Sequence, residues 1–179
     1  MKFEVKTRGS KEFYDEMLYI VTYCKKFIKN PKKRAWQYTK YLCLYMLISI
    51  IMCGGFTALY LMNKDWYCLV MVGAFVILFF FTLVLYITIK KRIKMYLDDK
   101  SDKTIEINEK CINYSSDTMN LKMNKEDISV IIISKNSICI LPKQLNKYAI
   151  SISMDYLDEF LKGASENGYD EIIVNNNKA

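Results

Sequence analysis

The chain has 179 residues, with 26 Lys and Arg against 19 Asp and Glu, a net charge of +7, and no His. This length allows one ordinary domain, or a small domain together with membrane segments. Residues 17–64 hold eight basic and no acidic side chains, whereas residues 98–179 hold ten basic and fourteen acidic ones. A nucleic-acid-binding domain would carry its own basic face, so the sequence predicts no nucleic-acid partner.

The six cysteines are spaced irregularly and form no CxxC pair; they are Cys24, Cys43, Cys53, Cys68, Cys111 and Cys139. A disulfide framework or a zinc site would need a closer and more regular arrangement. Asp98, Asp99 and Asp102 resemble the start of a calcium loop but lack its glycine and terminal Glu. We therefore predict no metal and no other cofactor.

The first 40 residues predict a cytoplasmic strand, an amphipathic helix and a basic juxtamembrane stretch. The opening KFEVKTR alternates polar and apolar residues, as a strand does. Ser10 is suited to cap a helix, and apolar residues then recur at helical spacing from Phe13 to Ile28. This apolar stripe could bind a membrane surface or pack on the C-terminal part of the chain.

Two uncharged stretches, residues 41–62 and 66–89, predict a transmembrane helical hairpin. At ~1.5 Å per residue they span roughly 33 and 36 Å as helices, enough for a hydrocarbon core of about 30 Å. A single helix through both would be far too long. The short polar break at residues 63–65, Asn-Lys-Asp, is therefore interpreted as an external turn.

The charges that flank the hairpin predict its orientation. Basic residues stay on the cytoplasmic side of a membrane, where they would also meet anionic lipid headgroups. Eleven of them flank the two spans: Lys25, Lys26, Lys29, Lys32, Lys33, Arg34, Lys40, Lys90, Lys91, Arg92 and Lys94. The turn holds one Lys and one Asp, so both chain ends are predicted to be cytoplasmic.

Small residues in the two spans suggest where the helices meet. In a hairpin hinged at residue 64, residue i lies level with residue 128 − i. Gly55 then lies level with Gly73, and Gly54 with Ala74, while Ala58 follows Gly54 by four residues. Close packing of small residues drives helix association in lipid, so these five residues are the predicted contact.

The remainder predicts a helix extension and linker over residues 90–102, then a β-rich cytoplasmic domain over residues 103–179. Short alternating runs between turn residues predict antiparallel strands. A helix capped by Ser153 and ended by Gly168 follows, then a possible last strand over residues 169–174 and a frayed tail. The docked N-terminal strand could complete this small α+β domain.

The overall layout resembles the YcxB-like family of bacterial membrane proteins. The residues that carry the resemblance are the opening MKFEVKTRGSKEFYDEM, the basic stretch, the two spans, INEKCINYS, NKEDISVIIISKNSICIL and a helix with LDEF. The resemblance implies a multi-pass protein of the bacterial cytoplasmic membrane whose cytoplasmic domain is pleckstrin-homology-like. It implies no catalytic residue.

The sequence bears on three classes of function. A membrane-anchored interaction module would use the hairpin as anchor and the β-domain as a surface for a protein partner. The alternative is an immunity protein against a membrane-acting toxin or peptide, which only the size and topology of the chain support. An enzyme is not predicted, because the sequence has no His, no glycine-rich phosphate loop and no GxSxG motif.

Overall fold

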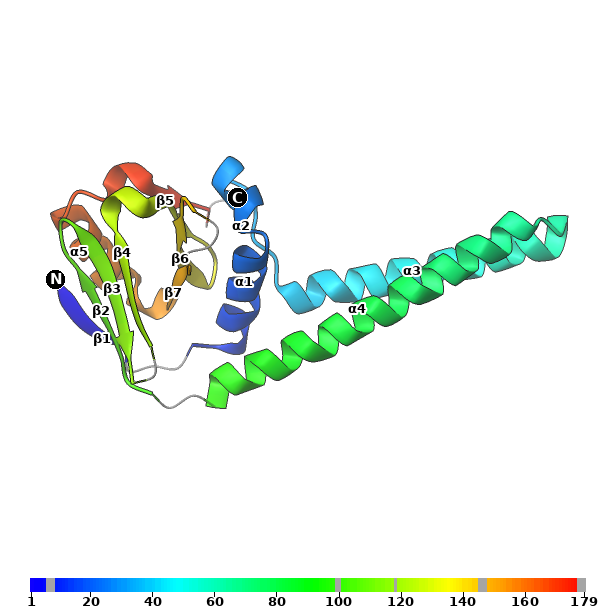
Figure 1. The fold of residues 1–179 in the computed structure, drawn as a ribbon, viewed down its shortest axis with the longest axis horizontal. Coiled ribbons are helices and arrows are strands. Elements are labelled where there is room, and N and C mark those ends of the chain that lie inside the picture. Colours follow the sequence, from blue (N-terminus) through cyan, green and yellow to red (C-terminus); the bar gives the residue numbers. More distant parts are fainter. Residues whose placement is uncertain (6–8, 99–100, 118, 145–147, 177–179) are drawn as a thin grey trace. The chain divides into compact units, whose positions relative to one another are not determined.

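The computed structural model describes residues 1–5, 9–98, 101–117, 119–144 and 148–176. The chain divides into two compact units (Figure 1). One unit is the helical hairpin, residues 37–94. The other unit combines residues 1–36 with residues 95–179. The segments before and after the hairpin therefore build one domain, which we call the β-domain. Residues 99 and 100 of the expected linker lie outside the described residues.

The hairpin consists of α3 (Tyr38–Asn63) and α4 (Trp66–Asp98), and both helices are long and apolar enough to cross a membrane. The turn has the expected place. Lys64 takes a left-handed conformation, φ 54°, and its N–H donates to the Tyr60 carbonyl at 2.8 Å. Asp65 then caps α4, because its side chain accepts from the N–H of Tyr67 at 3.1 Å. Helix α4 extends to Asp98, which lies within the helix extension and linker expected over residues 90–102.

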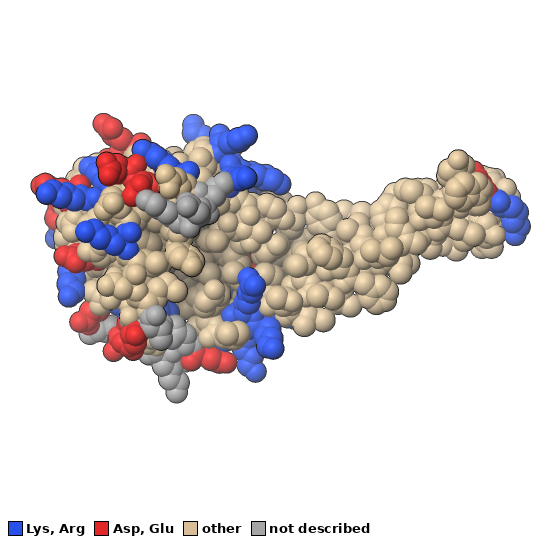
Figure 2. All heavy atoms as spheres, viewed as in Figure 1, with Lys and Arg blue, Asp and Glu red and all other residues tan. Residues whose placement is uncertain are grey.

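The surface of the hairpin is apolar along most of its length. Figure 2 shows no Lys, Arg, Asp or Glu on this face between the charged tip of the hairpin and its base. This matches the uncharged residues 41–62 and 66–89. Exposed apolar side chains include Leu61, Ile77 and Val84, each more than 60% exposed. Such a surface is suited to lipid rather than to water.

The two helices of the hairpin meet along a seam with the heptad spacing of a coiled coil. The seam residues are less exposed than their neighbours and alternate at intervals of four and three: Leu42, Met46, Ser49, Cys53, Phe56 and Tyr60 on α3, and Cys68, Val72, Phe75, Phe79, Thr82 and Tyr86 on α4. The rings of Phe56 and Phe75 stack at 5.8 Å. The Cys53 thiol donates to the Val72 carbonyl at 3.8 Å.

The described part of the β-domain holds two four-stranded sheets (Figure 1). Sheet A has the order β1-β2-β3-β4, and all of its neighbouring strands are antiparallel. Its strands are β1 (Lys2–Val5), β2 (Lys103–Ile107), β3 (Cys111–Ser116) and β4 (Asn120–Asn124). Strand β1 thus docks on the edge of the distant sheet, as predicted, with Phe3 opposite Ile105.

Sheet B has the order β7-β6-β5-β8. Its strands are β5 (Ile128–Ile133), β6 (Ser137–Pro142), β7 (Ile150–Ser153) and β8 (Ile173–Asn175). Strand β8 pairs parallel to β5, with Ile131 opposite Ile173. The expectation of purely antiparallel strands is therefore wrong for β8. A parallel partner needs a long crossover, and α5 lies within the connection.

An aliphatic core fills the space between the two sheets. Ile105 and Ile112 come from sheet A, and Ile131 and Ile140 from sheet B; all four are 0% exposed. Helix α5 (Leu157–Glu166) adds Phe160 and Ala164 to this core. It begins after the 3-10 turn Met154–Tyr156, in which the Ser153 side chain accepts from the N–H of Asp155.

Gly168 ends α5 as predicted. It has φ +71°, and its N–H donates to the Ser165 carbonyl at 3.1 Å. The N–H of Tyr169 reaches back to the Ala164 carbonyl at 2.9 Å, which completes a Schellman motif. The 3-10 turns Lys125–Asp127 and Asp170–Ile172 precede β5 and β8.

The outer face of sheet B is covered by the N-terminal helices. The expected single helix is two, α1 (Lys11–Thr22) and α2 (Cys24–Lys29), because Tyr23 leaves the helical conformation at φ −102°, ψ 25°. Ser10 caps α1 as predicted, accepting from the N–H of Phe13 at 3.1 Å. Helix α1 lies beside β6 (Figure 1). The apolar stripe therefore packs on the β-domain, and Ile20 and Phe27 are 0% exposed.

Candidate interaction surface

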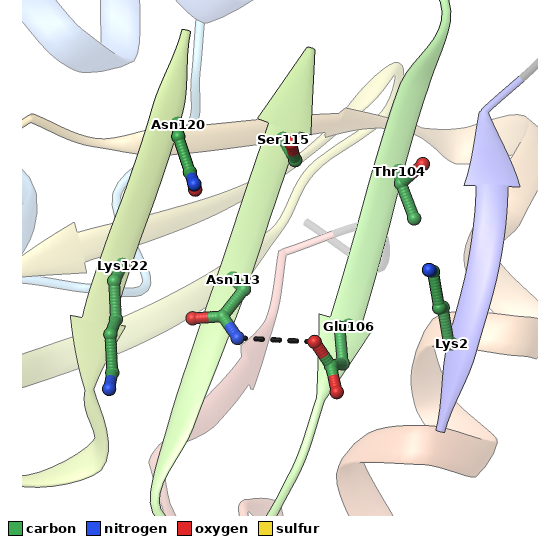
Figure 3. A pocket seen from close by; sticks show the side chains of 7 residues that line it. All are labelled: Lys2, Thr104, Glu106, Asn113, Ser115, Asn120 and Lys122. Carbon is green, nitrogen blue, oxygen red and sulfur yellow. Dashed lines mark hydrogen bonds between the residues drawn. The ribbon is translucent and has the colours of Figure 1, made fainter.

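The outer face of sheet A is polar and concave, and the hollow in it has a volume of about 580 Å³ (Figure 3). Its seven lining residues come from all four strands of the sheet: Lys2, Thr104, Glu106, Asn113, Ser115, Asn120 and Lys122. We call these seven residues the polar face. They occupy alternate positions of their strands, while the positions between them point into the apolar core. The alternation that forms the strands thus also builds the polar face.

The register of the sheet arranges the polar face in two rows across the strands. In one row, Lys2 lies opposite Glu106, Glu106 opposite Asn113, and Asn113 opposite Lys122. In the other row, Thr104 lies opposite Ser115, and Ser115 opposite Asn120. The first row therefore places an ammonium group at each end, with a carboxylate and an amide between them.

The one hydrogen bond drawn in Figure 3 joins these two middle groups. The side-chain amide of Asn113 donates to Glu106 at 3.2 Å. Hydroxyl, amide, carboxylate and ammonium groups together offer both donors and acceptors to a partner. The seven side chains include no nucleophile paired with a base of the kind that covalent catalysis requires. The arrangement can recognise a partner by hydrogen bonds and by charge.

The described residues contain no group of three or more His, Cys, Asp or Glu side chains that could hold a metal. The most shifted thiol among them belongs to Cys139. Burial raises its pKa to about 11, although hydroxyl groups of Ser151 and Ser137 bond to the sulfur at 3.4 and 3.7 Å. A thiol with this pKa stays protonated at neutral pH and is a poor nucleophile. Cys139 is therefore a core residue.

Beside Cys139, a buried carboxylate joins α1 to sheet B. Glu16 is 3% exposed and lies on the helix face that meets the β5–β6 turn. It accepts from the Asn136 N–H at 3.2 Å, from the Asn136 side-chain amide at 2.9 Å and from the Ser137 hydroxyl at 2.7 Å. Charge-assisted bonds of this kind are stronger than neutral ones. Glu16 thus fixes the N-terminal segment to a turn 120 residues away.

The small residues of the hairpin do not form the contact that the sequence predicts. Gly54, Gly55 and Gly73 lie on exposed positions, and a Cβ added at any of them would meet no atom within 4 Å. Ala58 and Ala74 are exposed as well. The seam runs along other faces of the helices, where its aromatic side chains keep the two backbones apart.

The eleven basic residues lie in four segments of the chain: α2, the stretch after it, the start of α3 and the end of α4. Lys25, Lys26 and Lys29 lie on α2, and Lys32, Lys33 and Arg34 lie in the segment after it. Lys40 is on α3, and Lys90, Lys91, Arg92 and Lys94 are on α4. In α2, the Lys26 ammonium lies 4.7 Å from the centre of the Tyr23 ring.

Comparison with protein-family models, with curated proteins and with solved structures finds no match.

The sequence predicted the β-domain as a binding surface, but not that these seven residues lie together on one face of a sheet. The alternation of polar and apolar residues in β2, β3 and β4 does indicate that Thr104, Asn113 and Lys122 lie on the polar side of their strands. The register that aligns them depends on backbone pairing between strands, which the alternation alone does not fix. The sequence predicted that the N-terminal strand docks on this sheet, but not the register that places Lys2 opposite Glu106, more than 100 positions away.

Proposed function

We propose that the protein is a membrane-anchored interaction module, with the hairpin as its anchor and the polar face of sheet A as the surface that binds a protein partner. The observation that carries this proposal is the pair of cross-strand rows on an exposed, concave sheet face. Binding residues on a rigid sheet lose little conformational freedom when a partner docks. The resemblance to the YcxB-like family is in keeping with this function.

Membrane anchorage is supported by two adjacent helices of sufficient length and by the position of the basic residues. In this proposal the turn at Lys64 lies outside the cell, and the β-domain lies in the cytoplasm of a bacterium. Anionic headgroups would meet the basic residues on either side of the hairpin. Both segments that build the β-domain would then lie on one side of the membrane, as their pairing in one sheet requires.

The topology predicts a specific labelling pattern in intact cells. Lys64→Cys, in a chain whose exposed and half-buried cysteines are replaced by alanine, should react with a membrane-impermeant maleimide. Ser165→Cys, at an exposed position of α5, should react only after the cells are opened. Labelling of Ser165→Cys but not of Lys64→Cys in intact cells would contradict the orientation.

The binding surface is tested by site-specific photo-crosslinking in the full-length, membrane-bound protein. A photoreactive amino acid at Ser115, an exposed centre of the polar face, should crosslink a discrete partner. The same amino acid at Lys162, an exposed position of α5, serves as the control and should not capture it. Asn113→Lys, which places a third ammonium in the first row, should reduce the Ser115 crosslink at least tenfold.

Equal crosslinking from both positions would mean that the polar face is not the binding surface. A Ser115 crosslink that is unaffected by Asn113→Lys would lead to the same conclusion. The purified partner should bind the wild-type chain and lose affinity for the Asn113→Lys chain. Hydrogen exchange of β3 in that variant should remain slow, which separates lost binding from lost folding.

A further inference from the structure

A second concave site lies on the other side of sheet A. It is a groove of about 660 Å³ between α1, the inner face of sheet A and the edge strand β7. Its apolar lining includes Phe13 and Leu18 of α1, Ile105 and Leu121 of sheet A, and Ile150 and Ile152 of β7. All of these residues belong to the β-domain. The groove is thus built from three elements that are distant in sequence.

The groove lies against the core of the domain. Ile105, Ile150 and Ile152 belong to the cluster between the two sheets and are almost completely buried, so its accessible apolar floor is formed by the half-buried Met17, Tyr114 and Leu121. One wall is aromatic: the Tyr14 ring meets Phe13 edge-on at 4.8 Å and stacks on Tyr96 at 5.4 Å. The groove therefore has depth and fixed walls, unlike an apolar patch on a flat surface.

The chemistry of the lining is that of a site for an amphiphile. Aliphatic and aromatic side chains make up most of the groove, and hydroxyl groups come from Ser116, Ser151 and Ser153. Lys103 is the single charged side chain among the described residues that line it. The volume lies within the ~300–1,000 Å³ typical of sites for one small ligand. It suits one acyl chain better than a two-chain phospholipid.

Exposed apolar side chains continue the lining outward. Val21 is 41% exposed, Met119 48% and Tyr148 73%, and all three line the groove. Large apolar side chains at the mouth extend the apolar lining from the floor to the outside of the groove. An acyl chain that enters along such a lining exposes less of its length to water.

We infer that this groove binds a long-chain fatty acid, with the acyl chain on the apolar floor and the carboxylate at the end that holds Lys103. The inference rests on the proposed function in one respect, since membrane anchorage would keep the domain next to a source of acyl chains. The ammonium group of Lys103 has three donors, so it can bind a carboxylate in addition to the partner that it already has. A peptide strand added to β7 would bury the edge of that strand but would leave the apolar floor unfilled.

The test uses the full-length protein in lipid nanodiscs and a palmitate that carries a photoreactive diazirine on its chain. After illumination, mass spectrometry should find the label on peptides of α1, β4 and β7, and excess unmodified palmitate should remove it. Labelling of α3 and α4 by palmitate dissolved in the bilayer is expected as background. The measured quantity is the competed labelling of the groove peptides.

Two variants and a control sharpen the result. Ala149→Trp fills the groove, and Leu121→Asn keeps its size but places an amide on the apolar wall; each should lower the competed labelling at least tenfold. Lys162→Trp adds the same large ring on exposed α5 and should label as the wild type does. Slow hydrogen exchange in β5 identifies which variants have kept the fold.

Unchanged labelling in folded Ala149→Trp and Leu121→Asn chains would overturn the inference, and so would competed labelling confined to α3 and α4. Either result would leave the proposed anchorage standing if Lys64→Cys still reacts from outside the cell. Loss of the Lys64→Cys reaction, with labelled groove peptides, would instead overturn the topology and leave the fatty-acid site in place.

Discussion

Glu16→Gln is expected to weaken the attachment of α1 to sheet B by about 2–4 kcal/mol. The carboxylate accepts three hydrogen bonds from Asn136 and Ser137, and one of the two Gln polar atoms cannot accept. Donors in a buried or half-buried site would then lose a charged acceptor, which costs free energy. Hydrogen exchange of peptides from α1 and from the β5–β6 turn should accelerate roughly 30- to 1,000-fold, while that of α5 changes little.

Glu12→Gln is the matched control, because Glu12 lies one turn earlier on α1 and is exposed. Glu12→Gln removes only the favourable interaction of this charge with the helix dipole, so the free energy of unfolding should fall by less than about 1 kcal/mol. If the two variants exchange equally fast, the bonds from Glu16 do not hold the helix in place. The N-terminal helices would then be attached through their apolar stripe alone.

The strands of sheet A could be predicted closely from the sequence. The runs KTIEIN and CINYSS match β2 (Lys103–Ile107) and β3 (Cys111–Ser116) because one side of sheet A faces the core and the other faces solvent, which imposes a two-residue period. The two helix ends were predicted equally well. The Ser10 side chain accepts a backbone hydrogen bond at the start of α1, and Gly168 adopts the positive φ that ends α5. Local chemistry therefore predicted the elements well.

Strands β5, β6 and β7 were also located from the sequence, but the arrangement of sheet B was harder to predict because both of its faces are covered. All six residues of β6 are buried, so the strand has no polar side that would reveal its orientation. Its parallel partner β8 is only three residues long and lies after α5 in the chain. The first part of the expected frayed tail is instead bonded to the domain: Asn176 donates from its N–H to the Ile133 carbonyl at 2.7 Å, and its side-chain amide donates to the Lys33 carbonyl at 3.0 Å. Residues 177–179 of that tail lie outside the described residues.

The contact within the hairpin could not be identified from small residues because every face of these helices is apolar. In a water-soluble helix the seam would stand out against polar residues. Here the positions that face outward are as apolar as Phe56 and Phe75 in the seam. Only the regular spacing of four and three residues distinguishes the seam. The glycines lie at other positions, so a prediction based on small residues placed the contact on the wrong faces of the helices.

The two concave sites differ in how far the sequence could predict them. The polar face needed only strand alternation and a register, whereas the groove needs α1, sheet A and β7 to be placed together. No local pattern encodes that placement. It depends in part on Glu16, because this residue attaches α1 to the β5–β6 turn.

Deletion of residues 2–5 is expected to destabilise the β-domain by more than about 2 kcal/mol, although it leaves both helices of the hairpin intact. Strand β1 pairs with β2 over four residues, and Phe3 stacks on Tyr156 at 6.1 Å. Its loss removes several backbone hydrogen bonds, each worth about 1 kcal/mol, and uncovers apolar area next to Ile105. Strand β2 would become an open edge, which favours aggregation.

Hydrogen exchange and limited proteolysis of the full-length and truncated proteins, both in membranes, measure this effect. In the full-length chain the N–H of Ile107 donates to the Met1 carbonyl at 2.7 Å, so exchange in the β2 peptide should accelerate most. Lys2→Ala, which keeps the strand and removes only an outward side chain, is the control and should leave β2 protected. If β2 in the truncated protein exchanges as slowly and resists protease as well as in that control, then β1 contributes nothing to the stability of the domain. The sheet would in that case be held by β2, β3 and β4 alone, and the pairing of the two segments on either side of the hairpin would not be needed for folding.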